Sequence, residues 1–128
     1  MSRKILFVCG SPLKKGNTNT LVARAVEAAR DAGAQVDVLD VTKLEYAKPG
    51  CTACMGCRSA GDFHCVLNDE LAHHVASLPT YDVVVLASPL YFWSFSAQMK
   101  GFVDRMYSLF KYDAKGITSA MEGKTLAL

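Results

Sequence analysis

Two short apolar runs, separated by segments with helical periodicity, constrain the fold of this chain most strongly. Residues 4–9 (KILFVC) and residues 83–87 (VVVLA) are rich in strand-forming apolar residues, which predicts strands buried on both faces of a sheet. Strands joined through helical crossovers of about a dozen residues run parallel. The 128 residues are therefore predicted to form a single domain, residues 1–128, with a doubly wound parallel α/β sheet.

The remaining elements are predicted from periodicity and from turn residues. Helices are expected at residues 18–32, 68–78 and 96–110, and further strands at residues 35–41 (an edge strand) and 123–128. The first helix is expected to have Asn17 or Thr18 as its N-cap and to stop at Gly33. Residues 114–123 are predicted to form a loop. Because no helix follows the fourth strand to cover it, the natural fold is expected to be longer than this chain.

Composition excludes several function classes. Half of the residues (51%) are apolar and the formal net charge is only +2, which argues against disorder and against a nucleic-acid surface. The longest mostly apolar stretch, residues 83–93, is interrupted by Ser88 and Pro89 and is shorter than the roughly 20 residues that a membrane span needs. The N-terminus lacks the pattern of a signal peptide. We therefore expect a cytoplasmic protein with neither a nucleic-acid nor a membrane partner.

Small polar residues and glycines follow the first predicted strand and lead directly into a helix, at residues 10–20 (GSPLKKGNTNT). Free backbone N–H groups and the positive end of the helix dipole favour a phosphate at such a place. The groups expected to contact a phosphate monoester are the side chains of Ser11, Asn17, Thr18, Asn19 and Thr20, together with the backbone at Gly10 and Gly16. The alternative is an ordinary strand-to-helix turn.

Aromatic residues dominate the segment after the third predicted strand, residues 88–105 (SPLYFWSFSAQMKGFVDR). Loops that follow parallel strands lie at one edge of the sheet, so this segment is expected beside the phosphate loop. A flat ring system can stack on the surface provided by Pro89, Leu90, Tyr91, Phe92 and Trp93. Alternatively, these rings fill the core or a subunit contact. Together with a phosphate site, the aromatic set favours flavin mononucleotide (FMN).

Four of the five cysteines lie within 15 residues, as Cys51, Cys54, Cys57 and Cys65. The spacing C-x-x-C-x-x-C with a fourth thiol nearby suits a [4Fe–4S] cluster. Tetrahedral zinc, a thiol–disulfide pair of Cys54 with Cys57, and free thiols remain alternatives. The fifth cysteine, Cys9, is expected to be a small buried apolar residue within the first strand.

The motifs GSP…GNT and SPLYFWSFSAQMKGFVDR resemble those of the NADPH-dependent FMN reductase and iron–sulfur flavoprotein group of the flavodoxin-like superfamily. This resemblance implies that Ser11, Asn17 and Thr18 hold the FMN phosphate. It also implies that the isoalloxazine ring is bordered by Pro89, Leu90, Tyr91, Phe92, Trp93 and Ser94. Iron–sulfur flavoproteins carry a similar compact cysteine pattern after the second strand.

The chain departs from the family pattern at two positions. Leu13 stands where the family has a basic residue, so Lys14 or Lys15 is expected to supply the positive charge. Trp93 stands where a small residue is common, which changes the expected shape of the ring pocket. The family's fifth strand, last helix and final flavin-contacting loop are missing.

The resemblance implies an FMN-dependent oxidoreductase that takes electrons from NAD(P)H and passes them to a small-molecule or protein acceptor, directly or through a [4Fe–4S] cluster. The flavin carries the chemistry, so no side chain is predicted to be catalytic. A homo-oligomer, either a dimer or a tetramer, is expected. The alternatives are an electron carrier reduced by ferredoxin and a nucleotide-binding domain without redox chemistry. Surface positions are expected for His64, His73 and His74, with a role for His64 as a tuning or replacement ligand beside Cys65 as the alternative. Structural or subunit contacts are expected for Asp104 and Arg105.

Overall fold

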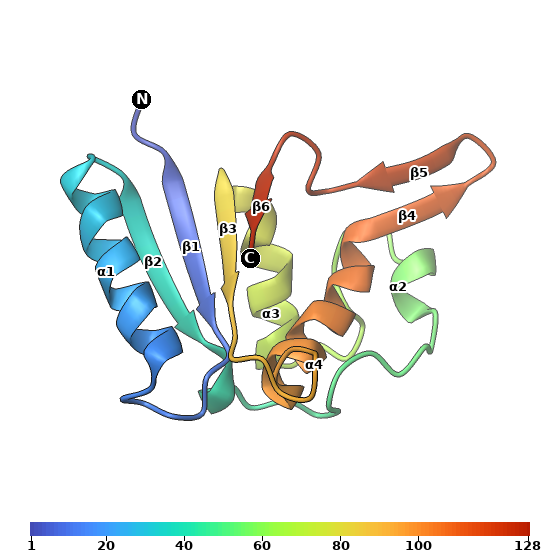
Figure 1. The fold of residues 1–128 in the computed structure, drawn as a ribbon. Helices are drawn as coiled ribbons and strands as arrows, with labels where there is room; N and C mark the ends of the chain where they lie inside the picture. Colours follow the sequence, from blue (N-terminus) through green and yellow to red (C-terminus); the bar gives the residue numbers. More distant parts are fainter.

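The computed structural model describes residues 1–128 and contains a four-stranded parallel sheet and a separate two-stranded hairpin (Figure 1). The strand order is β2 (Gln35–Asp40), β1 (Lys4–Cys9), β3 (Val83–Ala87) and β6 (Thr125–Ala127). All three strand pairs are parallel. The prediction of a doubly wound parallel sheet is confirmed, as are the edge position of β2 and the fourth strand near the end of the chain.

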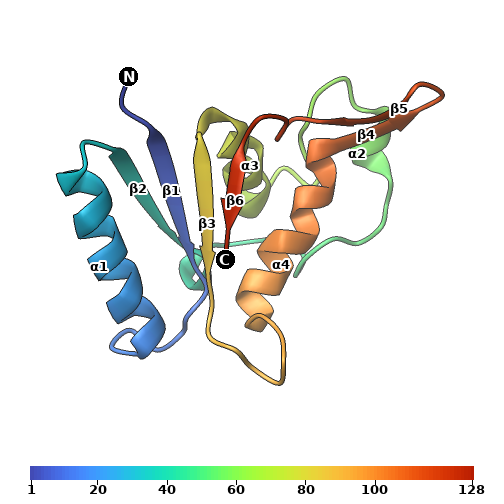
Figure 2. The ribbon, with the colours of Figure 1, turned by 45° about the horizontal axis from the view of Figure 1, so that its top comes forward.

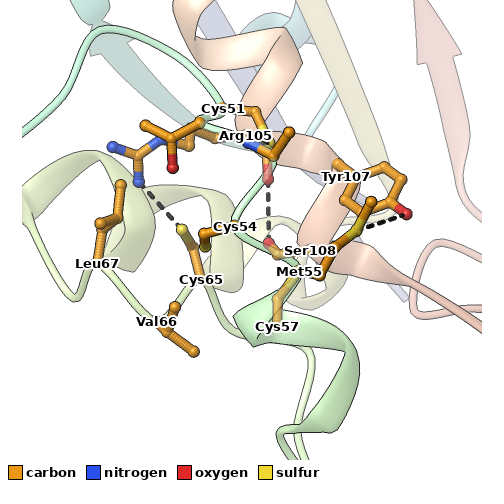
Figure 3. Close-up of a pocket in the computed structure, with 12 residues that line it drawn as sticks. Cys51, Cys54, Met55, Cys57, Cys65, Val66, Leu67, Arg105, Tyr107 and Ser108 are labelled. Atoms are coloured by element: carbon orange, nitrogen blue, oxygen red, sulfur yellow. Dashed lines mark hydrogen bonds between the residues drawn. The ribbon is translucent and has the colours of Figure 1, made fainter.

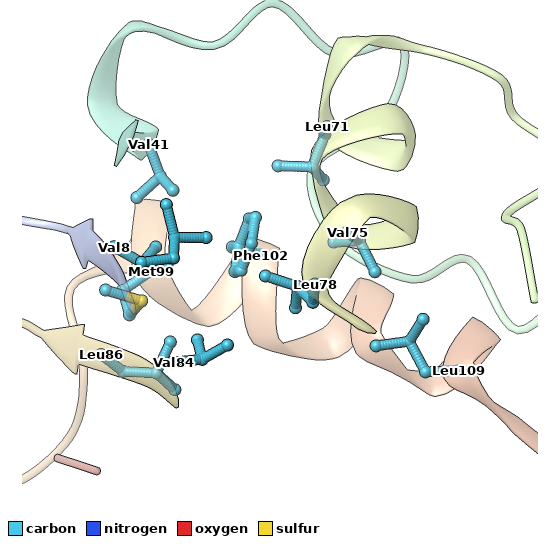
Figure 4. Packing of buried hydrophobic residues seen from close by; sticks show 11 residues of the cluster. Val8, Val41, Leu71, Val75, Leu78, Val84, Leu86, Met99, Phe102 and Leu109 are labelled. Carbon is cyan, nitrogen blue, oxygen red and sulfur yellow. The ribbon is translucent and has the colours of Figure 1, made fainter. Parts of the chain in front are cut away.

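Helices cover both faces of the sheet, with α1 (Asn17–Asp31) on one side and both α3 (Glu70–Ser77) and α4 (Ala97–Arg105) on the other (Figure 2). Alternate residues of β1 point to the two faces, because side chains alternate along a strand. Phe7 and Cys9 pack with Val22 and Val26 of α1. The larger cluster on the other face is shown in Figure 4 and consists of Leu6, Val8, Val41, Leu71, Val75, Leu78, Val84, Leu86, Met99, Phe102 and Leu109.

The predicted bounds of α1 are nearly right, but its predicted cap is wrong. Gly16 is the N-cap, and no side chain accepts a hydrogen bond from the helix start. The helix ends before Gly33, which has φ +85°, and the N–H of Gly33 donates to the carbonyl of Arg30 at 2.9 Å. The predicted stop at Gly33 is therefore confirmed, since glycine adopts this left-handed backbone without a steric penalty.

The predicted helix at residues 68–78 corresponds to α3, which Asp69 caps by accepting a hydrogen bond from the N–H of Ala72 at 3.0 Å. Two short 3₁₀ helices complete this face, η1 (Val41–Lys43) and η2 (Leu78–Thr80). Another short helix, α2 (Gly56–Ser59), lies apart from the sheet in the segment between η1 and α3.

The predictions for the last third of the chain need two corrections. The helix expected at residues 96–110 is α4, a 3₁₀ turn η3 (Met106–Leu109) and the first residue of a strand. The loop expected at residues 114–123 is right for residues 114–115 and 120–123, which form turns, but wrong for β5 (Gly116–Ser119). This strand pairs with β4 (Phe110–Asp113) in an antiparallel hairpin beside α2 (Figure 1). The connection between these two strands is only two residues long, which the weak apolar pattern of the region does not reveal. No helix is both long and apolar enough to cross a membrane.

Candidate cofactor site

The loop after β1 (residues 10–16, the β1–α1 loop) meets the segment that leads into α4 at the carboxyl edge of the sheet. The N–H of Gly10 donates to the carbonyl of Ala87 at 2.8 Å. The buried hydroxyl of Ser96 donates to the carbonyl of Gly10 at 2.6 Å and accepts from the N–H of Met99 at 3.2 Å, which caps α4. These contacts place the two loops that were predicted to bind FMN side by side at their bases.

Two polar side chains, those of Ser11 and Asn19, donate hydrogen bonds to backbone carbonyls of the β1–α1 loop. Ser11 is buried and its hydroxyl donates to the carbonyl of Leu13 at 3.4 Å. The amide of Asn19 donates to the carbonyls of Leu13, at 3.1 Å, and Lys14, at 3.4 Å. Because no side chain caps α1, its first backbone N–H groups are left for a ligand or for water. An anion at this place would also meet the positive end of the helix dipole.

The segment between β3 and α4 forms a tight turn (residues 90–94, the aromatic turn). Tyr91 and Ser94 exchange two backbone hydrogen bonds of 2.9 and 3.1 Å, and the two residues between them have positive φ, +47° at Phe92 and +61° at Trp93. Bulky residues rarely adopt this backbone conformation, so the turn is strained. The two side chains are 90% and 82% exposed, and their rings meet edge to face with centroids 4.9 Å apart. These rings therefore do not fill the core.

All four clustered cysteines line a single narrow cavity of about 20 Å³, shown in Figure 3. Cys57 and Cys65 are buried, whereas Cys51 and Cys54 are exposed, and no disulfide joins any of them. The rest of the lining is mostly apolar and includes Thr52, Ala53, Met55, Val66, Leu67, Arg105, Tyr107 and Ser108. No three His, Cys, Asp or Glu side chains are grouped so that they could hold a single metal ion.

The backbone of the cysteine segment (residues 51–65) turns sharply between its thiols. Ala53 and Met55 both have positive φ, +54° and +59°, and α2 begins directly afterwards. A hydrogen bond from the backbone of Gly56 lowers the pKa of the Cys54 thiol, with help from the Thr52 side chain. Burial raises the pKa of the Cys57 thiol, and the neighbouring sulfur of Cys65 raises it further. The exposed side of the cavity therefore favours a thiolate more than the buried side does.

The sequence analysis did not predict that Arg105 contacts these thiols. Its side chain is 1% exposed, pairs with Asp69 at 3.0 Å and donates to the sulfur of Cys65 at 3.1 Å. One sequence signal could have found it: Arg105 follows Phe102 by three residues, on the stripe of α4 that faces the core. A buried guanidinium needs partners of opposite charge, so this position predicts a buried polar site.

The short helix α2 of the cysteine segment and the β1–α1 loop lie toward opposite ends of α4 (Figure 1). Ser96, before the first turn of this helix, contacts Gly10, whereas Arg105, in its last turn, contacts Cys65. The chain leaves β2 at the carboxyl edge of the sheet, as predicted, but then carries its cysteines to the side of the hairpin. His73 is exposed and His74 half-buried, and neither lines the cavity.

Known proteins resemble this chain in sequence. An iron–sulfur flavoprotein from Archaeoglobus fulgidus is 33% identical over 105 residues, which cover 80% of this chain and 45% of that protein. An iron–sulfur flavoprotein from Methanosarcina thermophila is 32% identical over 102 residues, covering 80% of this chain and 51% of that protein. The chain thus spans about half the length of the curated relatives it matches.

Solved structures share the fold at lower identity. The azoreductase from Bacillus anthracis str. Sterne superimposes with a TM-score of 0.71 at 21% identity, over 98% of this chain and 66% of that one. The predicted flavodoxin-like α/β fold is confirmed. The family model described as NADPH-dependent FMN reductase matches residues 3–128. The chain therefore belongs to the NADPH-dependent FMN reductase family, as its loop motifs predicted.

Proposed function

We propose that this chain binds FMN at the carboxyl edge of its sheet and belongs to an oxidoreductase that uses NAD(P)H. The observation that carries the proposal is that the uncapped start of α1 and the exposed aromatic turn belong to two loops whose bases are in contact. A phosphate at the first and a planar ring at the second would satisfy groups that otherwise face water. The family match supports FMN as the molecule that has both parts.

The phosphate end is proposed to contact the first N–H groups of α1 and the side chains of Asn17 and Thr18. Gly16, as the N-cap, lets the backbone approach the anion closely. Lys14 and Lys15 are exposed on the same loop and would supply positive charge where the family has a basic residue in place of Leu13. Ser11 and Asn19 already bond to carbonyls of the loop, so their proposed role is to keep its shape.

The ring end is proposed to lie along residues 89–94. Strain at Phe92 and Trp93 is consistent with a turn held ready for a planar partner, since exposed rings of this size gain contact area when a ring stacks on them. When bound, FMN supplies the chemistry, because it accepts hydride from a nicotinamide and releases electrons singly or in pairs. The residues of the chain bind and orient it, and Tyr91 and Ser94 hold the turn closed.

A charge placed at the start of α1 tests the phosphate site. We expect Thr18→Glu to weaken FMN binding roughly tenfold or more in a fluorescence titration, because a carboxylate would occupy the place of the anion. The same substitution should leave riboflavin affinity nearly unchanged, because riboflavin lacks the phosphate. Ala28→Glu adds the same charge on the exposed face of the same helix and should change neither affinity. Equal loss of FMN and riboflavin binding in Thr18→Glu would contradict the proposed position of the phosphate.

Electron supply needs a separate test. NADPH or NADH is expected to bleach the FMN-loaded protein rapidly after mixing under anaerobic conditions. Bleaching by reduced ferredoxin alone would identify the chain as an electron carrier instead. Protein that refuses FMN altogether would exclude both functions.

We also propose that the four clustered cysteines hold a [4Fe–4S] cluster, and the set of donors fits. Four thiols face one mostly apolar cavity, and a buried guanidinium next to it would offset the negative charge of thiolates. The cavity is small, and its exposed side carries Cys51 and Cys54. The names of the relatives give the same indication.

Iron and sulfide analysis tests the cluster. Anaerobically purified or reconstituted protein should contain about four iron atoms and four sulfides per chain. Zinc at one atom per chain, or no metal, would support one of the alternatives. The quaternary state is proposed to be a dimer or tetramer, which light scattering on the FMN-loaded protein would measure.

A further inference from the structure

Arg105 contacts the chain on both sides of the cysteine segment. Before the segment, its Nε donates to the carbonyl of Gly50 and its Nη2 donates to the carbonyl of Lys48 at 2.9 Å. At the end of the segment, its Nη1 donates to the sulfur of Cys65 at 3.1 Å. One side chain from α4 thus holds together two parts of the chain that are 15 residues apart in sequence.

Asp69 completes this arrangement. Its carboxylate accepts from both terminal nitrogens of Arg105, at 3.0 and 3.4 Å, and from the backbone N–H groups of Ala47, at 2.8 Å, and Ala72, at 3.0 Å. Burial opposes ionisation of Asp69, but the hydrogen bonds from Ala72 and Ala47 and the pairing with Arg105 outweigh it and lower the pKa. The pair therefore stays charged at neutral pH, and the donor to Cys65 is fixed in place.

The side chain of Lys111 also supports this region, but only through backbone oxygens. Lys111 of β4 donates to the carbonyl of Cys57 and, at 3.1 Å, to the carbonyl of Ala60. It braces α2 through backbone oxygens alone. Arg105 differs because one of its five donors is directed at a sulfur.

We propose that Arg105 is a positioning residue for the cysteine site, which fixes both ends of the segment and sets the reduction potential of a cluster through its bond to Cys65. This inference rests on the proposed function of the four cysteines. Reduction adds one electron to the cluster and neither forms nor breaks a bond, so the charge at the sulfurs becomes more negative. A nearby cation and an N–H···S bond stabilise that form and raise the potential.

Two variants test the proposal without leaving a buried charge alone. The double variant Arg105→Gln with Asp69→Asn neutralises both members of the pair, and asparagine still caps α3. Arg105→Lys keeps the charge but loses the planar guanidinium. Only that group can donate at once to the two backbone carbonyls, to Asp69 and to Cys65. Lys100→Gln is the matched control, because Lys100 lies on the same helix but is exposed and pairs only with Asp104 along it.

Each protein is reconstituted with iron and sulfide under anaerobic conditions and titrated with dithionite while the reduced cluster is followed by electron paramagnetic resonance. We expect a more negative midpoint potential in the double variant and a smaller shift in Arg105→Lys. We also expect roughly 10- to 100-fold faster loss of iron to a chelator from the double variant. Lys100→Gln should match the wild type in both measurements.

A merely structural role would lower thermal stability without moving the potential of the cluster that remains. The proposal is overturned if the wild type binds four irons and both variants keep its potential and its rate of iron loss. If the double variant does not fold, an unchanged potential in Arg105→Lys has the same meaning. A wild type that takes up no iron would remove the proposed cluster, and this inference with it, while the FMN proposal would stand.

Discussion

The β1–α1 loop and the cysteine segment are both irregular stretches on the same framework, but they are held in different ways. The loop closes on itself through bonds from Ser11 and Asn19 to carbonyls at most six residues away. The cysteine segment relies on Arg105 and Lys111, whose partners are 36 to 57 residues distant in sequence. A locally closed loop can lose a side chain at little cost, whereas a segment held from a distance depends on the few side chains that hold it.

The largest expected loss of stability comes from removing the side chain of Arg105. Arg105→Ala should lower the free energy of unfolding by about 3–5 kcal/mol in urea titrations followed by circular dichroism, because it leaves the half-buried Asp69 carboxylate without its partner. In the loop, Ser11→Ala removes a hydrogen bond that is already 3.4 Å long and should cost less than about 1 kcal/mol. Similar losses in the two variants would show that the two regions are held alike.

The next effect concerns the thiol at the foot of the β1–α1 loop. Burial raises the pKa of Cys9 to about 11 from the usual 9.0, and the charge of Asp40 adds to this rise. Between these two values the folded chain keeps a proton that the unfolded chain has released, so stability falls as pH rises through this window. The loss should amount to roughly 2–3 kcal/mol by pH 11.

Urea titrations of the wild type and Cys9→Ala from pH 8 to pH 11 measure this loss. Cys9→Ala should be less stable than the wild type at pH 8, because it empties part of the core, and this deficit should shrink as pH rises. A deficit that is constant across the range would mean that Cys9 is not buried as the structure places it.

Two glycines, one in each region, sharpen the comparison. A Cβ added to Gly10 would lie 2.6 Å from the Cβ of Met99, which is fully buried, so Gly10→Ala should cost about 1–3 kcal/mol. A Cβ added to Gly56 would lie 2.5 Å from a methyl group of Val66, which is half exposed and can turn away. We expect Gly56→Ala to cost less than Gly10→Ala by thermal unfolding; the reverse order would contradict the packing described here.

A further, moderate effect concerns the contact between the β1–α1 loop and α4. Ser96→Ala removes the cap of α4 and the bond to the carbonyl of Gly10, and should cost about 1–2 kcal/mol in the same thermal assay. Ser96→Thr keeps the hydroxyl and serves as the control. A loss as large as that of Arg105→Ala would show that the loop, too, depends on a distant side chain.

Local chemistry explains which parts of this molecule could be predicted from sequence. The strands at residues 4–9 and 83–87 and the stop of α1 at Gly33 follow from apolar runs and from one glycine, and the structure has all three. The β4–β5 hairpin was missed because each of its strands has only four residues, which is too short for a periodic pattern. Its turn becomes evident only once the two strands are seen to pair.

The features of the candidate sites could likewise be predicted where they depend on neighbouring residues, but not where they depend on contacts between distant ones. The proposed phosphate site stays a prediction, made from residues 10–20 because the donors there are consecutive and precede a helix. The grouping of the cysteines was visible as spacing, but the bond from Arg105 to Cys65 spans 40 residues, and no local pattern encodes it. The N-cap of α1 was predicted wrongly because Asn17 and Thr18 are good caps by residue type, whereas the turn at Gly16 places them inside the helix.

Helix α4 sets the distance between the β1–α1 loop and the cysteine segment. It is nine residues long, about 13 Å at 1.5 Å per residue, with a loop attached at its first turn and the thiols at its last. A rigid helix of this length fixes the distance between its two ends. Movement of either loop would not change that distance. Lengthening or kinking this one element would alter the spacing of the two sites while leaving the residues of each untouched.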